Sequence, residues 1–179
     1  RHLLERELYE SQQRLKVLAE NDNLTGLSNR YYFDKSLRSA LARAERYRTK
    51  LALFFIDLDD FKNINDSYGH DVGDELLKNI ARIFQSMMRS GDDVCRLGGD
   101  EFAILLHQFD DKQDLINLAE RILEKLRTIQ KVGQHDLSIS ASIGIAIFPD
   151  SASDTIDLLK AADLAMYSAK KKGKNKWLF

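Results

Sequence analysis

A pair of glycines between two apolar runs constrains the fold of this chain most, because it predicts a hairpin. The apolar pair Val94-Cys95 lies before Gly98-Gly99, and the apolar run 103–106 lies after it. Glycine adopts turn conformations closed to other residues and lets a ligand approach the main chain. The acids Asp100-Glu101 follow at once, and bare backbone beside two carboxylates suits a phosphate and its metal ion. A plain hairpin with solvated acids is the alternative.

Size and charge exclude several classes of protein. The 179 residues are 44% hydrophobic, which suffices for a sizeable core in one domain with an appendage. With 27 basic and 28 acidic residues, no overall field draws the chain to nucleic acid or to a membrane surface. The single cysteine, Cys95, excludes an internal disulfide and is expected to be a buried apolar residue. No apolar run is long enough to span a bilayer. Because the chain begins with Arg1, we expect it to be a fragment of a longer protein.

The segment 1–21 predicts a helix with one apolar seam. Its leucines lie at a heptad spacing, with Ser11 in the missing slot: Leu4, Leu8, Leu15 and Leu18. Such a stripe needs a partner, so a short parallel coiled coil is one interpretation. A helix folded back on its own domain is the other. We expect the globular domain to occupy residues 22–179.

The remaining pattern predicts an α+β fold. Helices are expected over 29–48, 74–88, 112–130 and 154–172, and strands over 51–56, 137–148 and 177–179. A loop is expected between Gly69 and Gly73. Because the hairpin adds an antiparallel pair to alternating strands and helices, the sheet should be mixed and flanked by helices.

The strand over 51–56 ends in acids. Asp57 closes an apolar run typical of a strand buried on both faces, and Asp59 follows two residues later. Asp57, Asp100 and the carbonyl of Leu58 would supply hard oxygen ligands for a divalent ion. Such ions lower the charge on attacking and leaving oxygens in polymerase-like palms. The alternative is that the two aspartates cap the next helical turn.

Polar residues after these acids could bind a nucleotide. The backbone amides at Phe61 and Lys62 could bind a triphosphate, and Lys62 adds charge. Asn65 and Asp74 offer an amide and a carboxylate for a purine edge. A carboxylate that accepts from guanine N1 and its exocyclic amine would reject adenine. The basic run 170–174 could reach phosphate, or it could be a solvated helix end.

The segment 98–102 reads Gly-Gly-Asp-Glu-Phe, and further characteristic blocks lie at 22–30, 55–74, 142–146 and 162–170. With these blocks the chain resembles the GGDEF family of diguanylate cyclases, and the resemblance implies a fold similar to that of nucleotidyl cyclases and polymerase palms. The resemblance covers Asp22 to the C terminus, and several blocks in order are far more specific than one short motif.

The resemblance implies the condensation of two GTP molecules into cyclic di-3′,5′-guanylate, with release of pyrophosphate. It implies a metal site for Mg²⁺, with Mn²⁺ as a substitute, at Asp57, Leu58 and Asp100. The implied catalytic residues are Asp100, Glu101 and Lys62. The implied substrate-binding residues are Asn65, Asp74, Phe61, His70, Gly98, Gly99, Lys170 and Lys174. Lys174 lies where many relatives have arginine, which keeps the charge but loses the bidentate fork.

The resemblance also implies regulation. Arg89 and Asp92 match an Arg-x-x-Asp pattern that binds the product and inhibits the enzyme in relatives, with Arg121 as a secondary contact. On spacing alone, a polar helix end at a turn would explain Arg89 and Asp92. Catalysis is expected from a homodimer under an upstream sensor, with no nucleic-acid partner. The domain is expected to lie in the cytoplasm. Attachment of the full-length protein to the inner membrane is left open. The alternative function is a catalytically degenerate receptor for cyclic di-GMP or GTP.

Overall fold

The computed structural model describes residues 2–179 and has a five-stranded sheet at its centre. Arg1, the first residue of the expected N-terminal segment, lies outside the described residues. The strands are β1 (Leu51–Leu58), β2 (Asp93–Gly98), β3 (Glu101–Leu106), β6 (Ala141–Phe148) and β7 (Lys176–Leu178). Their order is β2-β3-β1-β6-β7. All neighbours pair antiparallel except β6 and β7, which pair parallel, so the predicted mixed α+β sheet is confirmed. Its likeness to polymerase palms stays a prediction.

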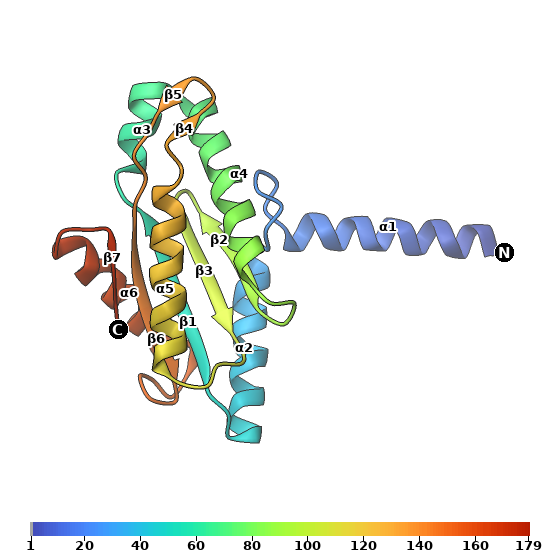
Figure 1. Ribbon diagram of the computed structural model, residues 1–179. Helices are drawn as coiled ribbons and strands as arrows, with labels where there is room; N and C mark the ends of the chain where they lie inside the picture. Colours follow the sequence, from blue (N-terminus) through green and yellow to red (C-terminus); the bar gives the residue numbers. More distant parts are fainter. Residues whose placement is uncertain (1) are drawn as a thin grey trace.

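Four helices cover the two faces of this sheet (Figure 1). One hydrophobic core joins the sheet to α4 (His70–Met87) and α5 (Lys112–Arg127). The other joins it to α2 (Arg30–Tyr47) and α6 (Thr155–Lys171). Asn29 begins α2 with a side-chain cap, as Asp111 and Asp154 do for α5 and α6. Alternate residues of β1 enter alternate cores, as expected for a strand buried on both faces.

The structure corrects two predictions about the middle and the end of the chain. Residues 61–68 form a helix, α3 (Phe61–Tyr68), and α4 begins at His70, so the loop expected between Gly69 and Gly73 is wrong. The strand expected over 137–148 begins only at Ala141. A separate small hairpin precedes it, with β4 (Lys131–Val132) and β5 (His135–Asp136). The apolar and β-branched residues before Ala141 explain the overextended strand. Cys95 is buried, as predicted.

The first helix, α1 (His2–Glu20), projects away from the domain (Figure 1). It contains no buried residue, and its predicted seam leucines are 61–71% exposed: Leu4, Leu8, Leu15 and Leu18. A helix folded back on its own domain is therefore wrong, and the coiled coil stays a prediction. Among residues 2–179, no helix is both long and apolar enough to cross a membrane.

Gly144 lets α6 approach the centre of the sheet. A Cβ atom there would lie 1.9 Å from the Ala162 carbonyl oxygen and 2.4 Å from the Met166 amide nitrogen. These are backbone atoms, so α6 as a whole would have to move. We expect Gly144→Ala to lower the free energy of unfolding by ~1–3 kcal/mol, measured by urea denaturation.

Gly91→Ala is the matched control, because no atom lies within 4 Å of a Cβ at Gly91. Equal stability of the two variants would contradict close packing of α6 on β6.

Candidate active site

The register of β1 and β3 brings the predicted acids together. Asp57, near the end of β1, pairs with Glu101 at the start of β3. The amide of Leu58 donates to the Asp100 carbonyl at 3.2 Å. Side chains alternate along β1, so Asp57 belongs to the face covered by α2 and α6. On that face Lys170 of α6 places its Nζ 3.1 Å from Asp57 Oδ1. The end of β1, the start of β3 and the helix α6 therefore form a charged cluster.

The acids of this cluster repel one another. Burial and the neighbouring Asp100 carboxylate raise the pKa of Asp57 to about 7, although Lys170 acts in the opposite direction. Burial and Asp100 also raise the pKa of Glu101. Partly buried carboxylates that disfavour each other's charge are stabilised by a bound cation.

The oxygen atoms present fit a divalent ion. Lys170 Nζ lies 3.4 Å from the Leu58 carbonyl oxygen, so one ammonium contacts both Asp57 and this carbonyl. A cation therefore already meets two of the three predicted ligands. Within residues 2–179, no group of three His, Cys, Asp or Glu side chains could hold a metal by itself. Two carboxylates and one carbonyl leave positions for phosphate oxygens and water, which is usual for Mg²⁺ beside a nucleotide.

Asp59 has a structural role that sequence reasoning missed. It is buried, and its carboxylate accepts from the hydroxyls of Ser140 and Ser142 at 2.6 and 2.7 Å. The amide of Asn175 donates to it at 2.9 Å. Asp59 thus ties the end of β1 to β6 and to the turn before β7. The alternative of a helix cap is wrong for Asp59, and the only hint in the sequence was the small polar Ser142 within an apolar strand.

The predicted base-reading residues lie on consecutive helices. Asn65 belongs to α3 and Asp74 to α4, and these two helices pack together. Phe61 is buried at the start of α3, whereas Lys62 and His70 are exposed at helix starts. Neither Lys62 nor His70 has an ion pair or a hydrogen bond to another side chain within the described chain. Both side chains are therefore available to a ligand, and within residues 2–179 Lys170, not Lys62 or His70, is the cation paired with Asp57.

The glycine turn is connected to the start of the domain. Gly98 and Gly99 have φ angles of 141° and 51°, which other residues rarely adopt. Arg96 donates to the Gly99 carbonyl through Nε and Nη2 at 3.0 and 2.8 Å, and through Nη1 to Asp22 at 3.1 Å. Arg96 links the turn to the segment that follows α1, because its planar guanidinium donates in two directions. The sequence around Arg96 carries no signal for this role.

This link predicts an acid-sensitive contribution to stability. Burial acts to raise the pKa of Asp22, but hydrogen bonds from Thr25 and the Arg96 guanidinium outweigh it and hold the pKa below 3.8. A lowered pKa stabilises the fold above pH 3.8, and this contribution is lost as pH falls through the lower folded-state value. We expect Asp22→Asn to lower Tm at pH 7, with a gap that narrows below pH 3.8.

Thermal unfolding between pH 2.5 and 7 measures this gap, with the exposed Asp66→Asn as control. A gap that is constant across the range would contradict the role of the Asp22 charge.

Lys174 lies just outside the acid cluster. Its Nζ donates to Asp60 Oδ1 at 2.6 Å, and this bond raises the pKa of Lys174. Asp60 and Lys174 have φ angles of 57° and 60°. The lysine is thus held at the rim of the site by a residue next to the buried Asp59.

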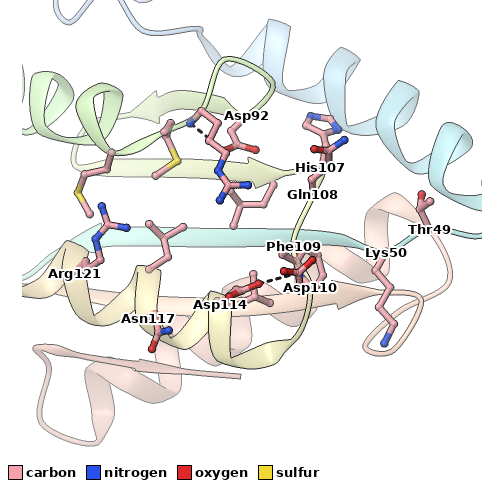
Figure 2. A pocket seen from close by; sticks show the side chains of 16 residues that line it. Thr49, Lys50, Asp92, His107, Gln108, Phe109, Asp110, Asp114, Asn117 and Arg121 are labelled. Atoms are coloured by element: carbon pink, nitrogen blue, oxygen red, sulfur yellow. Dashed lines mark hydrogen bonds between the residues drawn. The ribbon is translucent and has the colours of Figure 1, made fainter.

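The predicted product-binding residues gather at a separate cavity of about 710 Å³. Arg89 and Asp92 form a turn in which the Asp92 amide donates to the Arg89 carbonyl at 3.1 Å, and the Arg89 amide donates to the Asp92 carboxylate at 3.2 Å. Figure 2 shows Asp92 and Arg121 on different sides of the cavity, Asp92 before β2 and Arg121 on α5. The structure brings all three predicted residues to one cavity.

The fold and the site together define an α+β domain whose central strand ends in paired carboxylates beside a lysine. The family model "Diguanylate cyclase, GGDEF domain" matches residues 19–176. The chain therefore belongs to the GGDEF domain family, as the resemblance predicted.

Relatives support this membership. The chain is 40% identical over 172 residues to the bifunctional diguanylate cyclase/cyclic di-GMP phosphodiesterase MucR of Pseudomonas aeruginosa, covering 96% of this chain and 25% of MucR. The GGDEF domain structure of TpbB from the same species has a TM-score of 0.82 and 42% identity, covering 87% of this chain and 91% of that one. The coiled coil and GGDEF domain of DgcB from Caulobacter crescentus, in complex with c-di-GMP, has a TM-score of 0.90 and 27% identity. It covers 98% of this chain and 93% of that one. The chain spans only 25–36% of the length of the curated relatives MucR and TpbB.

Proposed function

We propose that this chain is a diguanylate cyclase domain that condenses two GTP molecules into cyclic di-3′,5′-guanylate and two pyrophosphates. The observation that carries the proposal is the register of Asp57 with Glu101, with Lys170 3.1 Å from Asp57. This arrangement combines hard oxygen ligands with a cation able to reach phosphate. The family membership of the chain supports the same reaction.

Each half of the reaction forms one bond and breaks another. The 3′-oxygen of one GTP bonds to the α-phosphorus of the other. The bond between that phosphorus and the oxygen that bridges the α- and β-phosphates breaks. Pyrophosphate leaves with the electron pair, and the 3′-hydroxyl proton passes to a carboxylate that we assign to Asp100, with Glu101 in the same site. Lys62 and Lys170 stabilise charge on the phosphates, and Phe61, His70, Gly98, Gly99 and Lys174 border the nucleotide. Most of the rate enhancement comes from positioning and charge.

The metal is proposed to be Mg²⁺, with Mn²⁺ able to replace it at the same oxygen ligands. Asp57, the Leu58 carbonyl and Asp100 would hold it, and when bound it would lower the negative charge of the phosphate oxygens.

Because one domain holds one GTP, ring closure requires two domains related by a twofold axis. The exposed seam of α1 supports a parallel coiled coil as the element that brings them together. Removing residues 1–20 is expected to weaken dimerisation and to lower turnover, measured by sedimentation and by product formation.

Two double variants refine this test. Leu8→Glu with Leu15→Glu charges the seam, and Gln12→Glu with Gln13→Glu adds the same charge elsewhere on α1. A truncated or seam-charged domain that dimerised and turned over as well as the intact chain would contradict the coiled coil.

Arg89, Asp92 and Arg121 are proposed to bind the product and to inhibit the domain. An arginine can stack on guanine and pair with phosphate, and a carboxylate can accept from the guanine edge. The cavity that these residues line supports this assignment. The cytoplasmic location, the upstream sensor and any membrane attachment stay predictions.

The test of the enzymatic function is product identification. A dimeric preparation incubated with GTP and Mg²⁺ should form cyclic di-GMP, detected by mass spectrometry, and EDTA should prevent it. Bound nucleotide without any cyclic product would favour the receptor alternative and reject the enzyme.

A further inference from the structure

Gly73 is a glycine inside a helix that its own backbone does not require. It is buried in the first turns of α4, and its φ angle lies outside the left-handed region that favours glycine. Glycine is among the poorest helix formers, and alanine is the best. A helix position with ordinary backbone angles and a glycine therefore indicates that space is needed there.

A side chain from α3 occupies that space. A Cβ atom at Gly73 would lie 1.9 Å from Asn65 Oδ1, 3.0 Å from Asn65 Cγ and 3.2 Å from Phe61 Cζ. The Asn65 amide thus lies directly against the backbone of α4 at the residue before Asp74. Within residues 2–179 the Asn65 side chain makes no hydrogen bond, so its amide donors and acceptor are available to a ligand.

We propose that Gly73 is a positioning residue for base recognition: it leaves room for the Asn65 amide beside Asp74, so that both meet one guanine edge. This inference rests on the proposed function, in which Asn65 and Asp74 read the base. The carboxylate accepts from N1 and the exocyclic amine, and the amide adds a donor for a guanine acceptor. A pair of groups can read one base only if their spacing is held within a fraction of an ångström.

The packing decides which neighbour would yield to a larger residue. Phe61 is buried, 8% exposed, within the core beneath α4. Asn65 is half-buried, and the contact is with the end of its flexible side chain. An alanine at position 73 would therefore displace the Asn65 amide and leave the core in place.

The experiment measures binding without turnover. Calorimetric titration with 3′-deoxyguanosine triphosphate and Mg²⁺ reports affinity, because this analogue lacks the attacking hydroxyl. We expect Gly73→Ala to weaken binding at least tenfold while its Tm is no lower than that of the wild type. Asn79→Ala on the same helix is the control, with expected binding within threefold of the wild type.

A double-mutant cycle separates positioning from a general structural role. If Gly73 acts through Asn65, Gly73→Ala should have no further effect on affinity in an Asn65→Ala background. Binding by Gly73→Ala within threefold of the wild type would overturn the inference. So would a tenfold loss that recurs in the Asn65→Ala background. The affinities of the wild type and the variants could follow this pattern while the wild type forms no cyclic di-GMP. That result would refute the proposed function and leave the role of Gly73 intact.

Discussion

Replacing Asp57 with asparagine is expected to abolish cyclic di-GMP formation, with turnover reduced on the order of 1000-fold or more. Asparagine keeps the shape of the side chain but removes the charge that would hold a divalent ion with Asp100. It also removes the nearer of two carboxylate partners of Lys170, whose Nζ lies 3.1 Å from Asp57 Oδ1 and 3.5 Å from Asp59 Oδ1. Initial rates at saturating GTP and Mg²⁺, with product quantified by mass spectrometry, measure the effect.

The stability of this variant separates catalysis from folding. The folded-state pKa of Asp57 is raised from 3.8 to about 7. The ionised carboxylate therefore destabilises the metal-free fold, and this destabilisation grows as pH rises from 3.8 toward 7. The neutral asparagine avoids this cost, so Tm at pH 8 without metal should be retained or raised. Asp66→Asn, an exposed substitution on α3, is the control. Activity of Asp57→Asn within a few-fold of the wild type would refute the assigned metal role.

Replacing Arg89 with alanine is expected to raise the inhibition constant for cyclic di-GMP at least tenfold. The variant loses both the stacking surface and the charged donors that would hold the product. Initial rates measured against increasing concentrations of added cyclic di-GMP report the change. Arg82→Ala is the matched control, because Arg82 lies on α4 and pairs with Asn79 outside the cavity.

The location of the cavity gives this prediction its specificity. Thr49, Lys50 and Leu106 line it, so it lies where β1 begins and β3 ends, away from Asp57 and Glu101. β1 has 8 residues, and at ~3.3 Å per residue its ends are about 23 Å apart. Loss of Arg89 should therefore leave the acids undisturbed. Unchanged inhibition of Arg89→Ala would remove the product site from this cavity.

Local patterns predicted the elements best where periodicity and punctuation agreed. The glycine turn, the continuous apolar run of β1 and the capped helices α2, α5 and α6 all have such signals, and the structure contains them. The loop predicted between Gly69 and Gly73 was wrong. Glycine usually signals a break, but Gly73 lies within α4, where it makes room for a neighbouring side chain. The predicted start of β6 at residue 137 was wrong, because apolar residues before Ala141 continue the strand pattern into a segment outside the sheet.

The sequence by itself determined the family, the strand that ends in Asp57 and the turn that carries Asp100 and Glu101. Only the tertiary structure decided which of these groups meet. The register of β1 with β3 sets Asp57 opposite Glu101, and the packing of α6 on the same face brings Lys170 to them. It also gave Asp59 a structural role, through Ser142 of β6 and Ser140 just before that strand. Side-chain periodicity depends on neighbours a few residues away, whereas these contacts join residues about 40 to 110 positions apart, which only packing brings together.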